Sequence, residues 1–193
     1  MSDMATHQAI AALVPQGAHV LDLGCGDGAL LAHLMRARGC TGYGVEIDDT
    51  KVQACVQRGV PVLQLNLDAG LHMFDDQSFD VVLQIDTLQN LRNAEVMLQE
   101  TVRVGRLGVL AFPNFAHWPN RWQVMRGRMP VTRHLPYEWY NTPNIRVATY
   151  ADFVRLVRRT GLHVVDSFGL HDGRVRRHWP NAQASTAVFC VRR

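Results

Sequence analysis

The stretch from Val20 to Ala29, VLDLGCGDGA, constrains the fold more than any other part of the chain. An apolar run ends in Asp22, and Gly24 and Gly26 follow before an amphipathic helix begins. Glycines at these positions permit a tight turn and a close approach of the backbone to a ligand, because they carry no Cβ atom. A strand, a glycine turn and a helix N-terminus in this order indicate a nucleotide-type site at the edge of a parallel sheet.

Two carboxylates help to decide which kind of nucleotide binds at this site. The spacing of Gly24, Gly26 and Ala29 satisfies the dinucleotide fingerprint, in which a pyrophosphate lies against the helix N-terminus. Asp22 and Asp27 would lie close to that pyrophosphate and repel it. A cofactor without phosphates and with positive charge avoids this repulsion, although Asp27 also has a simpler interpretation as the helix N-cap. An NAD-type oxidoreductase is therefore the weaker interpretation.

A third acid follows one strand–helix–strand unit later. Thr41 to Glu46 has the character of a strand, and Glu46 stands 24 positions after Asp22 (46 − 22). Its carboxylate is expected at the same edge of the sheet, where it can accept hydrogen bonds from both ribose hydroxyls of a nucleoside. A solvated acid at a strand end is the alternative. Ile47, directly after it, is expected to cover one face of an adenine ring.

The remaining chain alternates strand and helix patterns. Apolar runs predict strands, and helical spacing of apolar residues predicts helices. The expected strands are 20–23, 41–46, 61–65, 79–87, 107–112, 162–165 and 187–191, and the expected helices are 6–13, 29–38, 48–58, 94–104 and 152–160. This order predicts an α/β fold, doubly wound, with a mostly parallel seven-stranded sheet, helices on both faces and a final hairpin. The length of 193 residues fits a single domain over 1–193.

Composition excludes several classes of protein. The chain is 47% hydrophobic and 19% charged, with a formal charge of +3, as in an ordinary globular protein. No basic run is interleaved with aromatic residues, so nucleic-acid binding is not expected. The N-terminus lacks signal-peptide features and no apolar run reaches membrane-spanning length, which predicts a cytoplasmic protein without a membrane partner. The cysteines lack zinc-site spacing, which predicts free thiols and no metal: Cys25, Cys40, Cys55 and Cys190.

The segment 113–149 after the fifth predicted strand is too long for a simple connection. It holds five of the eight prolines and three of the four tryptophans. Its aromatic residues are Phe115, Trp118, Trp122, Tyr137, Trp139 and Tyr140, and its arginines are Arg121, Arg126, Arg128, Arg133 and Arg146, against one acid, Glu138. Trp, Tyr and Arg are enriched at binding hot spots.

Three interpretations of this insertion remain open. It folds over the cofactor as a substrate lid, it docks a protein partner, or its aromatic residues cap the open end of the sheet as a small core. His117 and His134 are candidate bases, but no neighbouring residue in the sequence fixes their orientation. Ordinary loop histidines are the favoured interpretation of both.

The insertion also helps to identify a family that the chain resembles. The glycine stretch, together with FPNFAHW (112–118), RGRMPVT (126–132) and LPYEWYNTPNI (135–145), closely resembles the MetW family of methionine biosynthesis proteins. The resemblance covers nearly the whole chain except its start and 171–185. The acid-x-Gly-x-Gly-x-Gly pattern is similar to motif I of the class I S-adenosylmethionine (SAM) methyltransferases, whose ligand carries an ammonium and a sulfonium. The resemblance therefore implies a class I methyltransferase fold and SAM or S-adenosylhomocysteine as the cofactor.

The resemblance also suggests which residues contact the cofactor. Similar proteins commonly have an Asp at the position of Asn66, where it holds the adenine amino group, and an Asn oxygen can accept the same hydrogen bond. An Asn/Asp-Pro-Pro-aromatic motif is absent after the fourth strand, which disfavours methyl transfer to amino groups of bases. We identify no catalytic residue, and the candidate cofactor-binding residues are Asp22, Gly24, Cys25, Gly26, Glu46, Ile47, Asn66, Leu67 and Gln84.

Two functional hypotheses follow from the resemblance. The first is a SAM-binding protein that works with homoserine O-acyltransferase and supports or regulates homoserine acylation. End-product sensing would suit such a protein, because SAM is the downstream product of that pathway. The second is an active methyltransferase on an unidentified small molecule. A missing base does not exclude the second hypothesis, because methyl transfer requires mainly in-line positioning of the nucleophile.

Overall fold

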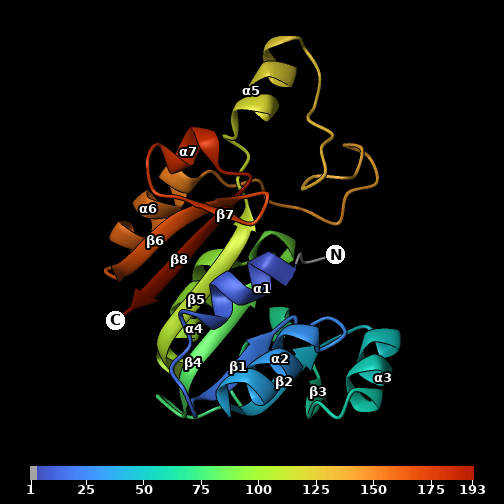
Figure 1. The fold of residues 1–193 in the computed structure, drawn as a ribbon, viewed down its shortest axis with the longest axis vertical. Helices are drawn as coiled ribbons and strands as arrows, with labels where there is room; N and C mark the ends of the chain where they lie inside the picture. Colours follow the sequence, from blue (N-terminus) through green and yellow to red (C-terminus); the bar gives the residue numbers. More distant parts are fainter. Residues whose placement is uncertain (1–3) are drawn as a thin grey trace.

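The strands of the computed structural model, which describes residues 4–193, form one sheet in the order β3-β2-β1-β4-β5-β8-β6-β7 (Figure 1). Their bounds are β1 (His19–Leu23), β2 (Thr41–Glu46), β3 (Val62–Gln64), β4 (Phe79–Ile85), β5 (Gly105–Pro113), β6 (His163–His171), β7 (Arg174–Arg176) and β8 (Thr186–Arg192). Strands β1 to β5 pair in parallel, and β8 is antiparallel to both β5 and β6. The predicted doubly wound α/β fold is therefore confirmed.

The predicted number of seven strands is wrong, because the described sheet has eight. The additional strand is β7, whose three residues pair with the end of β6 at the sheet edge. Its Arg-Val-Arg sequence carries no apolar run, so the pattern that predicts the other strands gives no signal here. Strand β6 also runs to His171, six residues beyond the predicted end at 165 (171 − 165).

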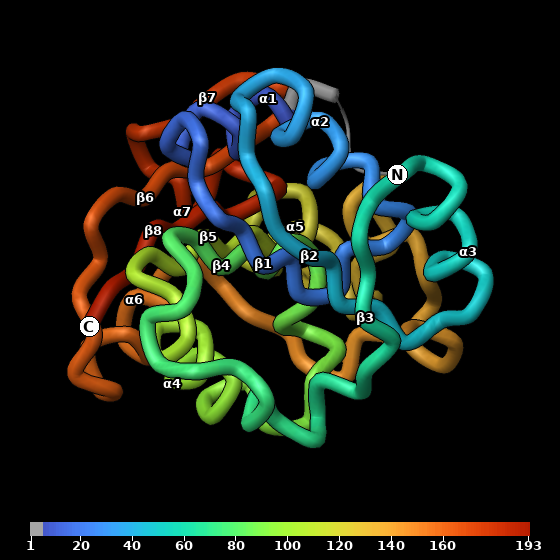
Figure 2. The backbone as a smooth tube through the Cα atoms, turned by 90° about the horizontal axis from the view of Figure 1, so that it is seen from below, coloured from blue at the N-terminus to red at the C-terminus, as the bar shows by residue number. Residues whose placement is uncertain are grey.

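Helices cover both faces of this sheet. They are α1 (Met4–Ala11), α2 (Ala29–Arg38), α3 (Asp49–Gln57), α4 (Ala94–Val104), α5 (Trp118–Met125), α6 (Tyr150–Arg159) and α7 (Pro180–Gln183), with short 3₁₀ turns η1 (Leu67–Ala69) and η2 (Leu88–Asn90). Figure 2 shows α1 and α2 on one face and α4 and α6 on the other. None of the helices in the described part of the chain combines the length and apolar character needed to cross a lipid bilayer.

Alternate side chains of β5 pack in two different cores, one on each face of the sheet. Val109 and Ala111 pack in the cluster that holds the buried leucines of α2, whereas Leu110 and Phe112 pack with the buried residues of α4 and α6. Successive side chains of a strand point to opposite faces, so a strand buried on both faces is apolar throughout. The continuous apolar run in this part of the sequence follows from that double burial.

The strand order places a switch point beside β1. Strand β2 lies on one side of β1 and β4 on the other, and the chain leaves these strands in opposite directions along the sheet. Ligands of doubly wound sheets bind at the carboxyl ends of the strands flanking such a point. The glycine turn, Glu46 and the residues after β4 all lie there, which fixes where a functional site is expected.

The insertion projects from the carboxyl end of β5, with α5 and the following loop extending away from the sheet (Figure 1). Its base is anchored by Asn114, which is 1% exposed. The Asn114 amide Nδ2 donates to the Ala184 carbonyl at 2.8 Å, and Oδ1 accepts from the Tyr150 N–H at 3.1 Å. Trp118 and Trp139, in contrast, are 61% and 69% exposed. The aromatic residues of the insertion therefore do not form the small core that was one interpretation.

Candidate functional site

A cavity of about 340 Å³ lies at the carboxyl edge of β1, β2 and β4. This volume is within the range of roughly 300–1,000 Å³ typical of small-molecule sites. Five of the nine candidate cofactor-binding residues line it together: Gly24, Glu46, Ile47, Asn66 and Leu67. Ile47 is exposed and lines the cavity, so its side chain is available to cover a ligand ring.

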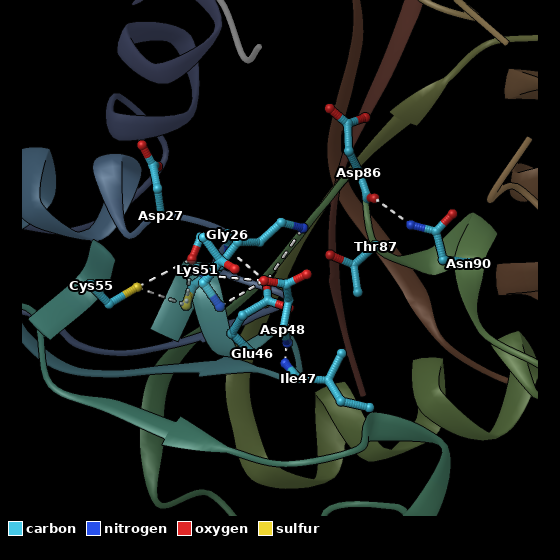
Figure 3. Close-up of polar contacts among 12 residues, drawn as sticks. Gly26, Asp27, Glu46, Ile47, Asp48, Lys51, Cys55, Asp86, Thr87 and Asn90 are labelled. Atoms are coloured by element: carbon cyan, nitrogen blue, oxygen red, sulfur yellow. Dashed lines mark hydrogen bonds and ion pairs between the residues drawn. The ribbon is translucent and has the colours of Figure 1, made fainter. Parts of the chain in front are cut away.

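Glu46 connects the glycine turn to the end of β2. Its side chain is buried, and Oε2 accepts a hydrogen bond from the Gly26 N–H at 3.0 Å. Oε1 accepts from the Ile47 and Asp48 N–H groups at 2.8 and 3.1 Å, and the Lys51 amine lies 4.0 Å from Oε2 (Figure 3). A carboxylate offers about four acceptor positions, so these three hydrogen bonds leave capacity for a ligand hydroxyl.

The glycine turn uses its own backbone donors within the protein. The N–H groups of Gly24 and Cys25 donate to the Val45 carbonyl at 2.8 and 3.0 Å, and that of Gly26 donates to Glu46. The Ala29 N–H donates to Asp27 Oδ1 at 3.1 Å. A pyrophosphate at a dinucleotide site requires such donors to be directed at the phosphate oxygens. Their internal use here disfavours a dinucleotide.

The charge-based reason for excluding a dinucleotide is weaker than the sequence suggested. Asp27 forms an ion pair of 2.7 Å with Arg58, which offsets its charge. The helix N-cap is Gly28 in a left-handed conformation, so the prediction that Asp27 is the N-cap is wrong. Asp27 lies one residue before the cap, and its Oδ1 accepts the Ala29 N–H. Asp22 is 2% exposed, and burial raises its pKa to about 7, with the charge of Glu46 adding to the effect. At neutral pH Asp22 therefore carries only part of its charge.

Gly24 is required by the packing of the protein as well as by the turn. Its φ is +73°, a left-handed conformation that favours glycine. A Cβ atom there would lie 2.4 Å from Thr87 Oγ1, the hydroxyl that donates to the Leu23 carbonyl at 2.8 Å. The missing side chain thus lets the end of β1 contact the segment after β4. Gly26 differs, because a Cβ atom there would meet nothing within 4 Å.

Cys25 and Gln84 do not line the cavity with their side chains. Cys25 Sγ lies 3.8 Å from Cys55 Sγ on α3, and burial raises the pKa of both thiols, so this pair packs rather than reacts. The Gln84 side chain is completely buried and donates through Nε2 to the Thr101 hydroxyl of α4. The structure thus places Gln84 in the core beneath α4, not at the cofactor cavity, because its position in β4 directs its side chain to that face.

Eight cavity residues were not among the candidates from the sequence, and five of them are polar: Lys51, Asp68, Asp86, Thr87 and Asn90. Lys51 is the only lysine of the chain, and this was the one signal that pointed to it. Asp86 has a left-handed φ of +55°, rare for a residue with a side chain. It is exposed where it meets the cavity, but protein surrounds its other sides, and this desolvation raises its pKa to about 6.

The two candidate histidines lie outside the cofactor cavity. His117 is 6% exposed and packs with its ring 4.7 Å from that of His171. Burial lowers the pKa of His117 to about 4, so it is neutral at physiological pH. His134 lines a neighbouring cavity under the insertion. Within residues 4–193, no cluster of three or more metal-ligating side chains is present.

A family of known protein sequences matches almost the whole chain. The sequence model of the family described as "Methionine biosynthesis protein MetW" matches residues 4–191. The bifunctional methionine biosynthesis protein MetXA/MetW of Rhodopirellula baltica is 34% identical over 200 residues, which cover 96% of this chain and 32% of that protein. The chain spans about a third of the length of the curated relatives that it matches.

Comparison with solved structures confirms the fold. A SAM-dependent methyltransferase from Thermotoga maritima superposes with a TM-score of 0.72 at 19% identity, covering 98% of this chain and 87% of that one. One from Mesorhizobium loti gives a TM-score of 0.71 at 16% identity, covering 98% of each chain. The fold is therefore that of the class I methyltransferases.

The raised pKa of Asp22 predicts a pH dependence of stability. The carboxyl has an ordinary value of 3.8 in the unfolded chain and about 7 in the folded protein. The folded state holds the proton more tightly, so this stabilisation is fully present below pH 3.8 and is lost as the pH rises through about 7. The loss amounts to about 4 kcal/mol. Asp22→Asn cannot ionise and should escape it.

Urea unfolding at about pH 4 and pH 8 measures this effect. Relative to wild type, Asp22→Asn should gain about 4 kcal/mol of unfolding free energy between the two pH values. The exposed carboxyl variant Asp75→Asn is the control, and its difference from wild type should change by less than about 0.5 kcal/mol. A difference for Asp22→Asn that is the same at both pH values would contradict the burial of an ionisable Asp22.

Proposed function

Because the chain belongs to the MetW family of methionine biosynthesis proteins, we propose that it binds SAM or S-adenosylhomocysteine and acts with homoserine O-acyltransferase. In this role it supports or regulates homoserine acylation. The cofactor occupies the cavity between the glycine turn, the end of β2 and the segment after β4. The insertion provides the surface on which the acyltransferase docks.

The observation that carries the cofactor proposal is the position of Glu46. A buried carboxylate at the cavity wall, fixed by three backbone N–H groups, is preorganised to accept hydrogen bonds from ribose hydroxyls. Ile47 and Leu67 supply apolar surface for an adenine ring on the same wall. The Asn66 side-chain oxygen accepts the Asp68 N–H at 3.0 Å, which holds Asn66 at the rim of the cavity.

The proposal of SAM instead of NAD rests on the glycine turn. The N–H groups of Gly24, Cys25 and Gly26 have acceptors within the protein, so they do not await phosphate oxygens. SAM has no phosphate and requires none of these donors.

The proposal of an acyltransferase partner rests on the insertion and on one relative. The Rhodopirellula baltica protein bears the name of MetXA together with that of MetW, and this chain covers only 32% of it. The family resemblance implies that the partner function is the acyltransferase. On the insertion, Trp122 is 48% exposed with the Arg126 guanidinium 4.6 Å from its ring centre, and Trp139 is 69% exposed. Exposed Trp and Arg side chains are typical anchors of protein interfaces.

An active methyltransferase is the second candidate. It is favoured by a further cavity that adjoins the cofactor cavity and offers space for an acceptor molecule. Formation of S-adenosylhomocysteine from SAM in the presence of a metabolite pool would support it. If no S-adenosylhomocysteine forms while SAM is bound, only the binding role remains supported.

Replacing Glu46 tests the cofactor proposal. Glu46→Gln keeps the shape of the side chain but removes its charge and half of its acceptor capacity. Affinity for S-adenosylhomocysteine, measured by titration calorimetry, should fall by about tenfold or more, which corresponds to about 1.4 kcal/mol. The control is Asp49→Asn, an exposed acid three residues later that does not line the cavity. Equal affinities of Glu46→Gln and wild type would refute the assigned role.

Replacing tryptophans tests the docking surface. Trp122→Ala and Trp139→Ala should each reduce co-purification with homoserine O-acyltransferase and the activity of that enzyme, because each removes a large exposed anchor. Trp179→Ala is the matched control, since Trp179 is 79% exposed but lies outside the insertion. If both insertion variants retain the complex and the acyltransferase activity, the insertion is not the docking surface.

A further inference from the structure

A second cavity, of about 440 Å³, adjoins the proposed cofactor cavity. The two share Lys51, Asp86 and Asn90 in their walls, so they are connected. Figure 3 shows the Lys51 amine reaching into the space between Glu46 and Asp86, with the Asp86 carboxylate pointing away from Glu46. The far wall of the second cavity comes from the insertion and includes Arg133.

Opposite charges face this cavity without pairing with each other. Asp86 and Arg133 both line it, and both also line a smaller cavity beside it. Among the ion pairs of the described residues, none joins the two side chains, and none involves Arg133. A ligand that carries both a positive and a negative group would satisfy both of these charges at once.

Gln89 fixes the insertion at the wall of the second cavity. Gln89 is 8% exposed, and its side-chain oxygen has no hydrogen-bond partner in the part of the chain that the structure describes. Gln89 lines the second cavity, and its backbone carbonyl holds the insertion by accepting the Ile145 and Arg146 N–H groups at 3.1 and 3.0 Å.

The backbone at Asp86 is held in a strained form that presents its side chain to the cavity. Its φ of +55° lies in the left-handed region. The Asp86 N–H donates to the Ala111 carbonyl at 2.8 Å, and the Asn90 amide donates to the Asp86 carbonyl at 3.3 Å. Strain of this kind persists where the surrounding structure fixes it, often at ligand sites.

We propose that the second cavity is a binding site for a free α-amino acid. The ligand ammonium donates to the Asp86 carboxylate, and the ligand carboxylate accepts from the Arg133 guanidinium and the Lys51 amine. The site goes beyond the proposed cofactor binding, because Arg133 lines the second cavity and not the cofactor cavity, whereas Lys51 and Asp86 lie in the wall that the two cavities share. Its position beside the cofactor cavity suits either a methyl acceptor or a regulatory ligand.

Titration calorimetry on the full chain tests the proposal, with and without saturating S-adenosylhomocysteine. The probes are the twenty proteinogenic L-amino acids and L-2-aminobutyrate. Two matched analogues of L-2-aminobutyrate each lack one charged group: 1-aminopropane lacks the carboxylate and butanoate lacks the ammonium. At least one amino acid should bind in both conditions. L-2-Aminobutyrate should bind more tightly than either analogue, because only the zwitterion satisfies both sides of the cavity.

Variants locate the site. Arg133→Gln and Asp86→Asn should each weaken amino-acid binding by about tenfold or more. Asn tolerates the left-handed backbone, so Asp86→Asn keeps the local conformation. Arg128→Gln is the control, because Arg128 is an exposed insertion arginine that lines neither cavity. Thermal melting of each variant identifies a folding defect. S-adenosylhomocysteine binding of Arg133→Gln, whose site does not line the cofactor cavity, separates failure of the cofactor proposal from loss of the amino-acid site.

Three outcomes would overturn the proposal. The first is that no amino acid binds, or that an analogue with one charge binds as well as L-2-aminobutyrate. The second is that folded Arg133→Gln or Asp86→Asn binds like wild type. The third is that saturation with S-adenosylhomocysteine abolishes amino-acid binding, because these charges would then hold the amino-acid end of the cofactor itself.

Discussion

The arrangement of the candidate site depends on the Glu46 carboxylate and the backbone N–H groups that it accepts. Glu46 joins the glycine turn after β1 to the start of α3, and its contact with Gly26 crosses between two strand–helix units. Gly24 completes the junction on the other side, since its missing Cβ admits Thr87 from the segment after β4. Three strand ends are thus held together around one cavity before any ligand binds, which is the preorganisation that lowers the cost of binding.

The base and the outer part of the insertion differ in their contacts. Its base is fixed to the sheet through Asn114 and through the Gln89 carbonyl, and its residues near Arg133 close one side of the second cavity. Its outer part carries exposed tryptophans and projects beyond the sheet. In the described part of the chain no residue of 113–149 lines the cofactor cavity, so a lid over the cofactor is not seen, and docking of a partner to the outer part stays a proposal.

The sequence predicted the features that short-range patterns encode. Apolar strands, amphipathic helices and the 24-residue spacing of Asp22 and Glu46 (46 − 22) indicated the α/β fold and the cavity wall. Features that depend on tertiary contacts were missed. Strand β7 forms by pairing with the edge of β6. The Gln84 side chain points toward α4. Lys51 and Asp86 come from separate parts of the chain and line the same cavity. The partial neutralisation of Asp22 depends on burial, which residue order alone does not reveal.

The central claim is that the cavity beside Glu46 takes SAM-type ligands and not dinucleotides. Calorimetric titration of the wild-type chain with S-adenosylhomocysteine, followed by a separate titration with NAD, tests it most directly. We predict saturable one-to-one binding of S-adenosylhomocysteine and no heat of binding with NAD. Saturable binding of NAD, with none for S-adenosylhomocysteine, would contradict the claim.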